Sequence, residues 1–116
     1  MVSKEERLYE IMRHFTYKPP RKAIVCKDGF KISIQAGGAL YSDPRDDEGP
    51  YTHVECGYPS EPEVLLIPFV EPGSEPFTDA VYGYVPAGVI DKVIRLHGGI
   101  KSGDLPELLL EQKDNL

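Results

Sequence analysis

The residues best suited to chemistry in this sequence are one arginine and three tyrosines in its middle third. Arg45 is the only cation between residues 37 and 80, and Tyr41, Tyr51 and Tyr58 surround it along the chain. A guanidinium holds phosphate or carboxylate with two hydrogen bonds, and a phenol ring can stack on a nucleobase while its hydroxyl stays hydrated. The set therefore predicts a site for a nucleotide-like ligand.

The acidic residues near Arg45 leave a second interpretation of it open. Residues 37–80 carry ten acidic groups and one basic group, a charge of −9, whereas residues 1–36 carry +4 and residues 81–116 carry −1. Arg45 could therefore pair with a neighbouring carboxylate and hold its loop together. The carboxylates in reach are Asp43, Asp46 and Asp47.

A nucleotide site in this segment needs more cations than Arg45, because carboxylates repel phosphate. The positive N-terminal third offers Arg21, Lys22 and Lys31, either within one subunit or across a subunit interface. The predicted ligand-binding set is therefore Arg45, Tyr41, Tyr51, Tyr58, Arg21 and Lys22.

A metal site is the weaker chemical hypothesis. His53, Glu55 and Cys56 lie close together, but on a strand His53 and Glu55 point to one face and Cys56 to the other. Cys26 is the only other cysteine, and two thiols are too few for a four-thiolate zinc site. We expect both cysteines to act as small strand hydrophobes and predict no metal and no cofactor.

Motifs for covalent or phosphoryl-transfer catalysis are missing from the sequence. There is no Gly-x-Ser-x-Gly elbow and no phosphate-binding loop ending in Lys-Ser or Lys-Thr. The acidic run Asp46-Asp47-Glu48 lacks the ligand spacing of a calcium loop and is expected to be solvated. These features favour a binding protein over an enzyme.

The elements that must position these residues predict a single α+β domain, with a mostly antiparallel sheet of four to five strands and helices packed on it. A capping box at Ser3 and apolar residues at helical spacing predict an N-terminal helix over residues 4–15. A β core with long acidic, proline-rich loops is expected over residues 22–85, beginning with a hairpin that turns at Asp28-Gly29. Its further strands are expected over residues 51–56, 64–67 (a short edge strand) and 80–85, where Gly83 marks a bulge or a close backbone approach.

The C-terminal part is expected to hold a helix over residues 87–97 and a short tail helix over residues 104–113, capped by Asp104. The tail carries more leucines than one narrow helical stripe can bury, namely Leu105, Leu108, Leu109 and Leu110. These leucines must be covered by the domain or by another subunit, so we expect a homo-oligomer.

Several short motifs resemble a group of small proteins encoded by bacteriophages and prophages. They are Ser42-Asp43-Pro44-Arg45, Gly49-Pro50-Tyr51-Thr52, Val54-Glu55, Gly57-Tyr58-Pro59-Ser60, Val81-Tyr82-Gly83-Tyr84-Val85-Pro86 and His97-Gly98-Gly99. The resemblance covers about residues 22–100 and implies a genomic setting without a mechanism. Small accessory phage proteins are often binders that interfere with host defences, so the resemblance implies a counter-defence role in the host cytoplasm.

Overall charge and hydropathy narrow the class of partner. The net charge of −6 argues against coating of nucleic acid or binding to an anionic membrane, and no apolar run is long enough to span a bilayer. The first hypothesis is a non-enzymatic protein that sequesters a nucleotide-like host signalling molecule. One alternative is an inhibitor that binds a basic host protein through the acidic surface over residues 41–79, and the other is a small metal-assisted hydrolase.

Overall fold

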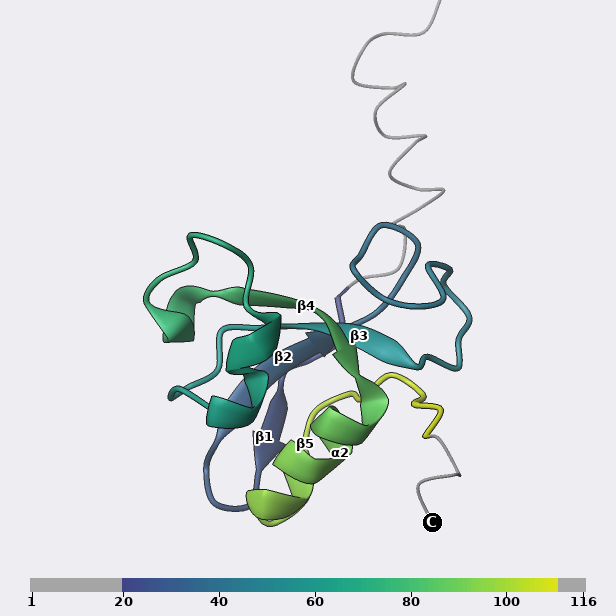
Figure 1. Ribbon diagram of the computed structural model, residues 1–116. Helices are drawn as coiled ribbons and strands as arrows, with labels where there is room; N and C mark the ends of the chain where they lie inside the picture. The colour runs from purple at the N-terminus through teal and green to yellow at the C-terminus, as the bar shows by residue number, and fades with distance from the viewer. Residues whose placement is uncertain (1–19, 111–116) are drawn as a thin grey trace, which may run out of the picture.

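Five antiparallel strands in the order β4-β3-β2-β1-β5 form the sheet in the computed structural model, which describes residues 20–110 (Figure 1). The strands are β1 (Ile24–Cys26), β2 (Lys31–Gln35), β3 (His53–Gly57), β4 (Val81–Pro86) and β5 (Ile100–Ser102). The helices are the α-helix α2 (Ala87–Leu96) and the 3-10 helices η1 (Val64–Phe69) and η2 (Phe77–Asp79). Figure 1 shows α2 and η1 on the same side of the sheet, which confirms the predicted α+β class.

The β1–β2 hairpin forms as its turn residues predict. Gly29 has a φ of 97°, a left-handed conformation that glycine adopts without steric cost. The Asp28 carboxylate accepts a hydrogen bond from the Phe30 amide at 2.9 Å, which closes the turn. Ile24 then pairs with Ile32, and both side chains are buried.

The core lies between the sheet and α2. Every second residue of β2 is buried, and α2 turns one apolar stripe inward. The core side chains include Ile24, Phe30, Ile32, Ile34, Val54, Leu66, Tyr82, Val85, Ile90, Val93 and Ile94. Cys26 and Cys56 are free thiols in this core, and burial raises the pKa of both, so they act as the small hydrophobes expected of them.

The segment expected to form an edge strand over residues 64–67 forms η1 instead, so that prediction was wrong. Glu63 caps this helix by accepting a hydrogen bond from the Leu65 amide at 3.2 Å. Pro68 lies inside η1 and has no amide to donate to a strand ladder. The residue that pairs with the edge of β4 is Val70, which forms an isolated antiparallel bridge with Tyr82.

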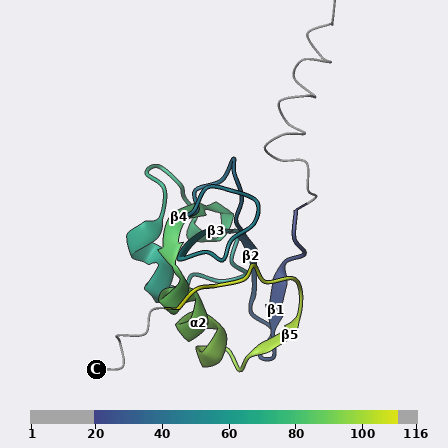
Figure 2. The same ribbon diagram turned by 90° about the vertical axis from the view of Figure 1, so that its right-hand side faces the viewer.

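The predicted tail helix is also wrong over its described part, residues 104–110, which contains no helix. Tyr51 donates its amide to the Glu107 carbonyl and accepts the Leu109 amide, both at 2.8 Å. These bonds hold the tail in an extended conformation beside the segment that precedes β3. Figure 2 shows the chain crossing back from the β5 edge toward β3.

Two more expectations concern the chain ends. Asp104 caps no helix; its carboxylate accepts the Lys22 amide at 3.2 Å. Residues 111–113 of the predicted tail helix and the whole predicted helix over residues 4–15 lie outside the described residues. Strand β5 was not predicted, because all three of its side chains are exposed and show no alternation.

Candidate functional site

The loop between β2 and β3 and the middle of β4 bring two tyrosine rings together on the surface. Tyr41 and Tyr84 stack with their ring centroids 5.6 Å apart and an interplanar angle of 29°, and each residue is 43% exposed. The Tyr84 amide donates to the Tyr41 carbonyl at 3.0 Å, which ties the loop to the strand. The Tyr41 amide donates to the Glu55 carboxylate at 2.9 Å. We refer to these two rings as the Tyr41–Tyr84 pair.

A bulge in β4 presents the Tyr84 ring. Val54 of β3 pairs with Val85 and Cys56 pairs with Tyr82, so that Gly83 and Tyr84 together oppose Glu55 alone. Tyr84 has a φ of 49°, the left-handed region that residues with a Cβ rarely adopt. The bulge predicted at Gly83 is therefore confirmed, and it re-aims the next side chain outward.

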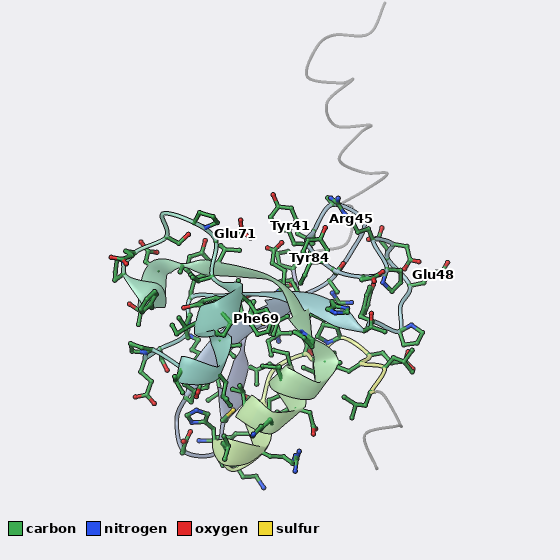
Figure 3. The ribbon with its side chains drawn as sticks, viewed as in Figure 1. Tyr41, Arg45, Glu48, Phe69, Glu71 and Tyr84 are labelled. Carbon is green, nitrogen blue, oxygen red and sulfur yellow. The ribbon has the colours of Figure 1, made fainter. Side chains whose placement is uncertain are left out.

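Gly83 also lets a carboxylate approach the pair. A Cβ at Gly83 would lie 2.9 Å from Glu71 Oε2 and 3.2 Å from Tyr41 Cδ2. The Glu71 carboxylate and the Tyr41 ring therefore lie close to each other beside Gly83. Within residues 20–110 the Glu71 carboxylate forms no hydrogen bond or ion pair. Figure 3 shows Glu71 beside Tyr41 and Tyr84.

Arg45 is exposed, and in Figure 3 it lies at the same edge of the molecule as the pair. In the described part of the chain its side chain forms no hydrogen bond or ion pair, so no aspartate there braces the loop through Arg45. Asp46 instead accepts the Glu48 and Gly49 amides, both at 3.0 Å, and these bonds lower the pKa of Asp46. Asp47 accepts the Gly38 amide at 2.9 Å.

Ser42 is the buried anchor of this loop. Its residue is 0% exposed, and its hydroxyl accepts the Gly37 amide at 3.1 Å. The same oxygen lies within 3.2 Å of the carbonyl oxygens of Gly37 and Pro44, one of which it can donate to. The loop that carries Tyr41 and Arg45 is therefore held by hydrogen bonds at several points.

Tyr51 does not join the pair, although the sequence grouped it with Tyr41. It is 1% exposed, and its hydroxyl donates to the Asp46 carbonyl at 2.8 Å, so its ring is not free to stack on a ligand. Burial raises the pKa of Tyr51, and the neighbouring Arg21 guanidinium opposes that rise. Arg21 itself donates to the Ala36 carbonyl at 2.9 Å. Both residues form bonds within the fold, and neither is placed at the Tyr41–Tyr84 pair.

Two further predicted ligand residues lie elsewhere. Tyr58 follows the end of β3 and is 58% exposed, with a φ of 53° and its amide bonded to the Ala80 carbonyl. It is separated from the pair along β3, since Tyr84 lies opposite Glu55. Lys22 has an exposed side chain next to β1, which is separated from β4 by two strands.

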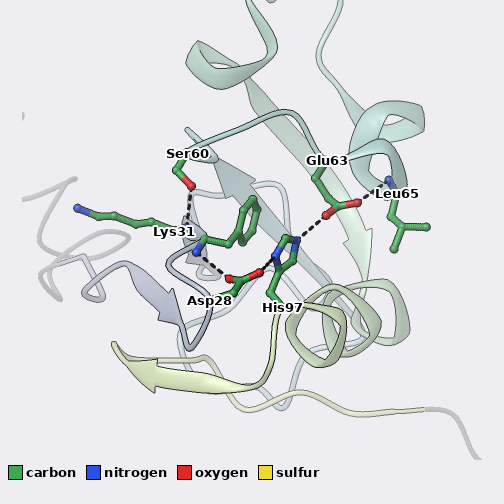
Figure 4. Close-up of polar contacts among 7 residues, drawn as sticks. Asp28, Lys31, Ser60, Glu63, Leu65 and His97 are labelled. Atoms are coloured by element: carbon green, nitrogen blue, oxygen red, sulfur yellow. Dashed lines mark hydrogen bonds and ion pairs between the residues drawn. The ribbon is translucent and has the colours of Figure 1, made fainter.

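A second polar cluster joins the β1–β2 turn, the start of η1 and the end of α2 (Figure 4). His97 Nδ1 is 2.6 Å from Asp28 Oδ2, and Nε2 is 2.8 Å from Glu63 Oε1. The imidazole stacks on Phe30 with the ring centroids 4.1 Å apart. Burial alone would lower the pKa of His97, but the hydrogen bonds and charges of Glu63 and Asp28 raise it. We call this set of residues the His97 clamp.

The His97 clamp has the components of an acid–base site but not its geometry. Both ring nitrogens are taken by carboxylates, so neither is free to accept a proton from a substrate. The Asp28 carboxylate is also held by the Phe30 amide, which together with His97 lowers the pKa of Asp28. The clamp therefore fastens three elements to one another.

The residues weighed for metal binding do not converge. Cys56 is buried on the opposite face of β3 from His53, and His53 Nδ1 lies 4.0 Å from the nearer Asp43 oxygen. Residues 20–110 contain no group of three or more His, Cys, Asp or Glu side chains placed to hold a metal ion. A hollow of about 400 Å³ opens beside His53; it is lined by Thr52, His53, Pro86, Ala87, Gly88, Val89 and Leu109. His53 is the one ionisable group in that lining.

Comparison with family models, with curated proteins and with solved structures found no match. None of the helices in the described range has the length and apolar character needed to cross a bilayer. The candidate site is therefore defined by its geometry alone. It consists of the Tyr41–Tyr84 pair, with Glu71 beside it and Arg45 at the same edge of the molecule. Sequence reasoning found Tyr41 and Arg45 but missed Tyr84 and Glu71, although the bulge signal at Gly83 pointed to this stretch of β4.

Proposed function

We propose that this protein is a non-enzymatic binding protein that docks on a positively charged host protein through the Tyr41–Tyr84 pair and the acidic loops around it. The observation that carries the proposal is an exposed tyrosine, Tyr84, held in the left-handed conformation with a second ring stacked on it. Such a conformation costs about 1–3 kcal/mol, and strained residues of this kind concentrate at functional sites. Tyrosine is also enriched in protein interfaces, since it combines a broad apolar ring with a hydrated hydroxyl.

The charge of the surrounding loops sets the kind of partner. Residues 37–80 carry −9, and Asp43, Asp46, Glu48, Glu61 and Glu75 in this segment are exposed. Fields of one sign steer partners of the opposite sign and reject like-charged ones. The excess of exposed carboxylates in this segment therefore favours a basic protein surface over an anion as the partner. The resemblance to small phage-encoded proteins supports a host protein, met in the cytoplasm, and a counter-defence role.

A nucleotide-like host signalling molecule is the second candidate ligand. The guanidinium of Arg45, without a partner among residues 20–110, favours it, because this group could hold a phosphate. Burial of Tyr51 and the bond of Arg21 to Ala36 count against two members of the predicted nucleotide set. The Glu55 and Glu71 carboxylates beside the pair would repel a phosphate. The basic protein partner is therefore the better supported proposal.

Fluorescence anisotropy tests the proposal with a labelled peptide of alternating arginine and serine residues, and calorimetry tests ATP and cyclic dinucleotides in parallel. We expect the peptide to bind and its affinity to fall as salt rises from about 50 to about 300 mM, because exposed charges are screened. We expect no heat from the nucleotides. Nucleotide binding that is lost in Arg45→Ala, with no peptide binding, would replace this proposal with the nucleotide hypothesis.

A further inference from the structure

The surface around the pair has the features of a site for one cationic side chain. The two rings stack with their centroids 5.6 Å apart, and each residue is still 43% exposed, so the pair is accessible to a planar group of a partner. Cations are attracted to the face of an aromatic ring, and arginine is used in this way more often than lysine. In the described part of the chain, no cation lies over either ring.

The carboxylates of Glu55 and Glu71 lie beside these rings, and they differ in the hydrogen bonds that they already form. Glu55 Oε1 already accepts the Tyr41 amide. The Glu71 carboxylate forms no hydrogen bond or ion pair within residues 20–110, and its Oε2 lies beside Gly83, where the Tyr41 ring also lies. A cation on the pair would therefore find an uncommitted carboxylate next to the ring on which it stacks.

We propose that the partner places an arginine side chain on the Tyr41–Tyr84 pair, with its guanidinium bonded to the Glu71 carboxylate. This inference rests on the proposed function, since it names the contact through which the basic partner is recognised. A guanidinium fits both parts of the site, because it is planar enough to stack on a phenol ring and presents paired donors to a carboxylate. A lysine ammonium would satisfy the carboxylate without the stacking.

The experiment compares three peptides that are identical except at one position, which is arginine, lysine or citrulline. Citrulline has nearly the shape of arginine and carries no charge. We expect the arginine peptide to bind about fivefold more tightly than the lysine peptide, and the citrulline peptide to bind least. Glu71→Gln should reduce affinity for the arginine peptide about tenfold. Glu75→Gln is the control, because it removes the same charge from an exposed position on the same loop.

The outcomes separate this inference from the function on which it rests. Equal affinity for arginine and lysine, together with an unchanged Glu71→Gln, would overturn the arginine site while leaving a salt-sensitive basic partner in place. Equal weakening by Glu71→Gln and Glu75→Gln would also overturn it, because general charge would then explain the binding. Absence of binding by all three peptides would overturn both proposals.

Discussion

His97 gives the sharpest test of how the structure holds its elements together, through the variant His97→Ala. The side chain is 13% exposed and the Glu63 side chain is 12% exposed, so their hydrogen bond is largely shielded from water. Loss of this charge-assisted bond and of the stacking on Phe30 should destabilise the protein by about 2–4 kcal/mol. The Asp28 side chain is 48% exposed, so water screens its bond to His97.

The pH dependence of this loss follows from the direction of the two pKa shifts. The pKa of His97 is raised above its unfolded value of about 6.5, so the folded protein holds the proton more tightly. The stability that His97 contributes is therefore fully present below about pH 6.5 and is lost as the pH rises through the pKa of His97 in the folded protein. The pKa of Asp28 is lowered, so its contribution is present above about pH 4 and disappears as the pH falls through its folded value.

Urea unfolding of the native sequence and of His97→Ala, measured from acid to alkaline pH, gives the test. The difference in unfolding free energy should be largest between about pH 4 and 6.5 and should shrink at alkaline pH. His53→Ala is the matched control, because His53 is 37% exposed and lies 4.0 Å from its carboxylate, and it should cost less than about 1 kcal/mol. Parallel curves for the native sequence and His97→Ala across the whole range would refute a charged clamp.

Three further predictions concern the loop, the bulge and the tail. Ser42→Ala should destabilise the protein by about 1–2 kcal/mol in chemical denaturation, because Ser42 is 0% exposed and its loss leaves the Gly37 amide without its acceptor; an unchanged midpoint would contradict this role. Gly83→Ala should weaken binding of the arginine peptide, because the added methyl group would lie 2.9 Å from the Glu71 carboxylate and 3.2 Å from Tyr41. Unchanged affinity for the peptide would count against the proposed approach of these two groups. Leu109 and Leu110 are 50% and 45% exposed, as expected of leucines that join subunits. Replacing both with serine should therefore lower the mass measured by light scattering. An unchanged mass would rule out that role of the tail.

Those parts of the fold that the sequence predicts correctly depend on short stretches of chain. The β1–β2 hairpin follows from Asp28-Gly29 because the turn and its closing hydrogen bond lie within three residues. The helix α2 follows from the apolar spacing of Ile90, Val93 and Ile94. The bulge follows from one glycine in an otherwise alternating strand.

The features that sequence reasoning missed depend on partners far away along the chain. The tail is extended because Tyr51 offers it two backbone hydrogen bonds, and nothing near Leu108 reveals that partner. His97 finds its two carboxylates 69 and 34 residues away. Tyrosine side chains suit both core and surface, so the exposure of Tyr84 follows from the bulge in β4, whereas Tyr51 is buried where it pairs with the distant tail.

The central claim is that the Tyr41–Tyr84 pair forms the binding surface, and two matched variants test it most directly. Tyr84→Gly and Tyr58→Gly each remove an exposed tyrosine that has a left-handed backbone, and neither changes the net charge. Relief of strain, lost stacking and added flexibility should nearly cancel in Tyr84→Gly, leaving stability within about 1 kcal/mol of the native sequence. Measured with the same labelled arginine peptide, Tyr84→Gly should bind about tenfold more weakly while Tyr58→Gly binds as the native sequence does. Equal affinity of the two variants for the peptide would contradict the claim.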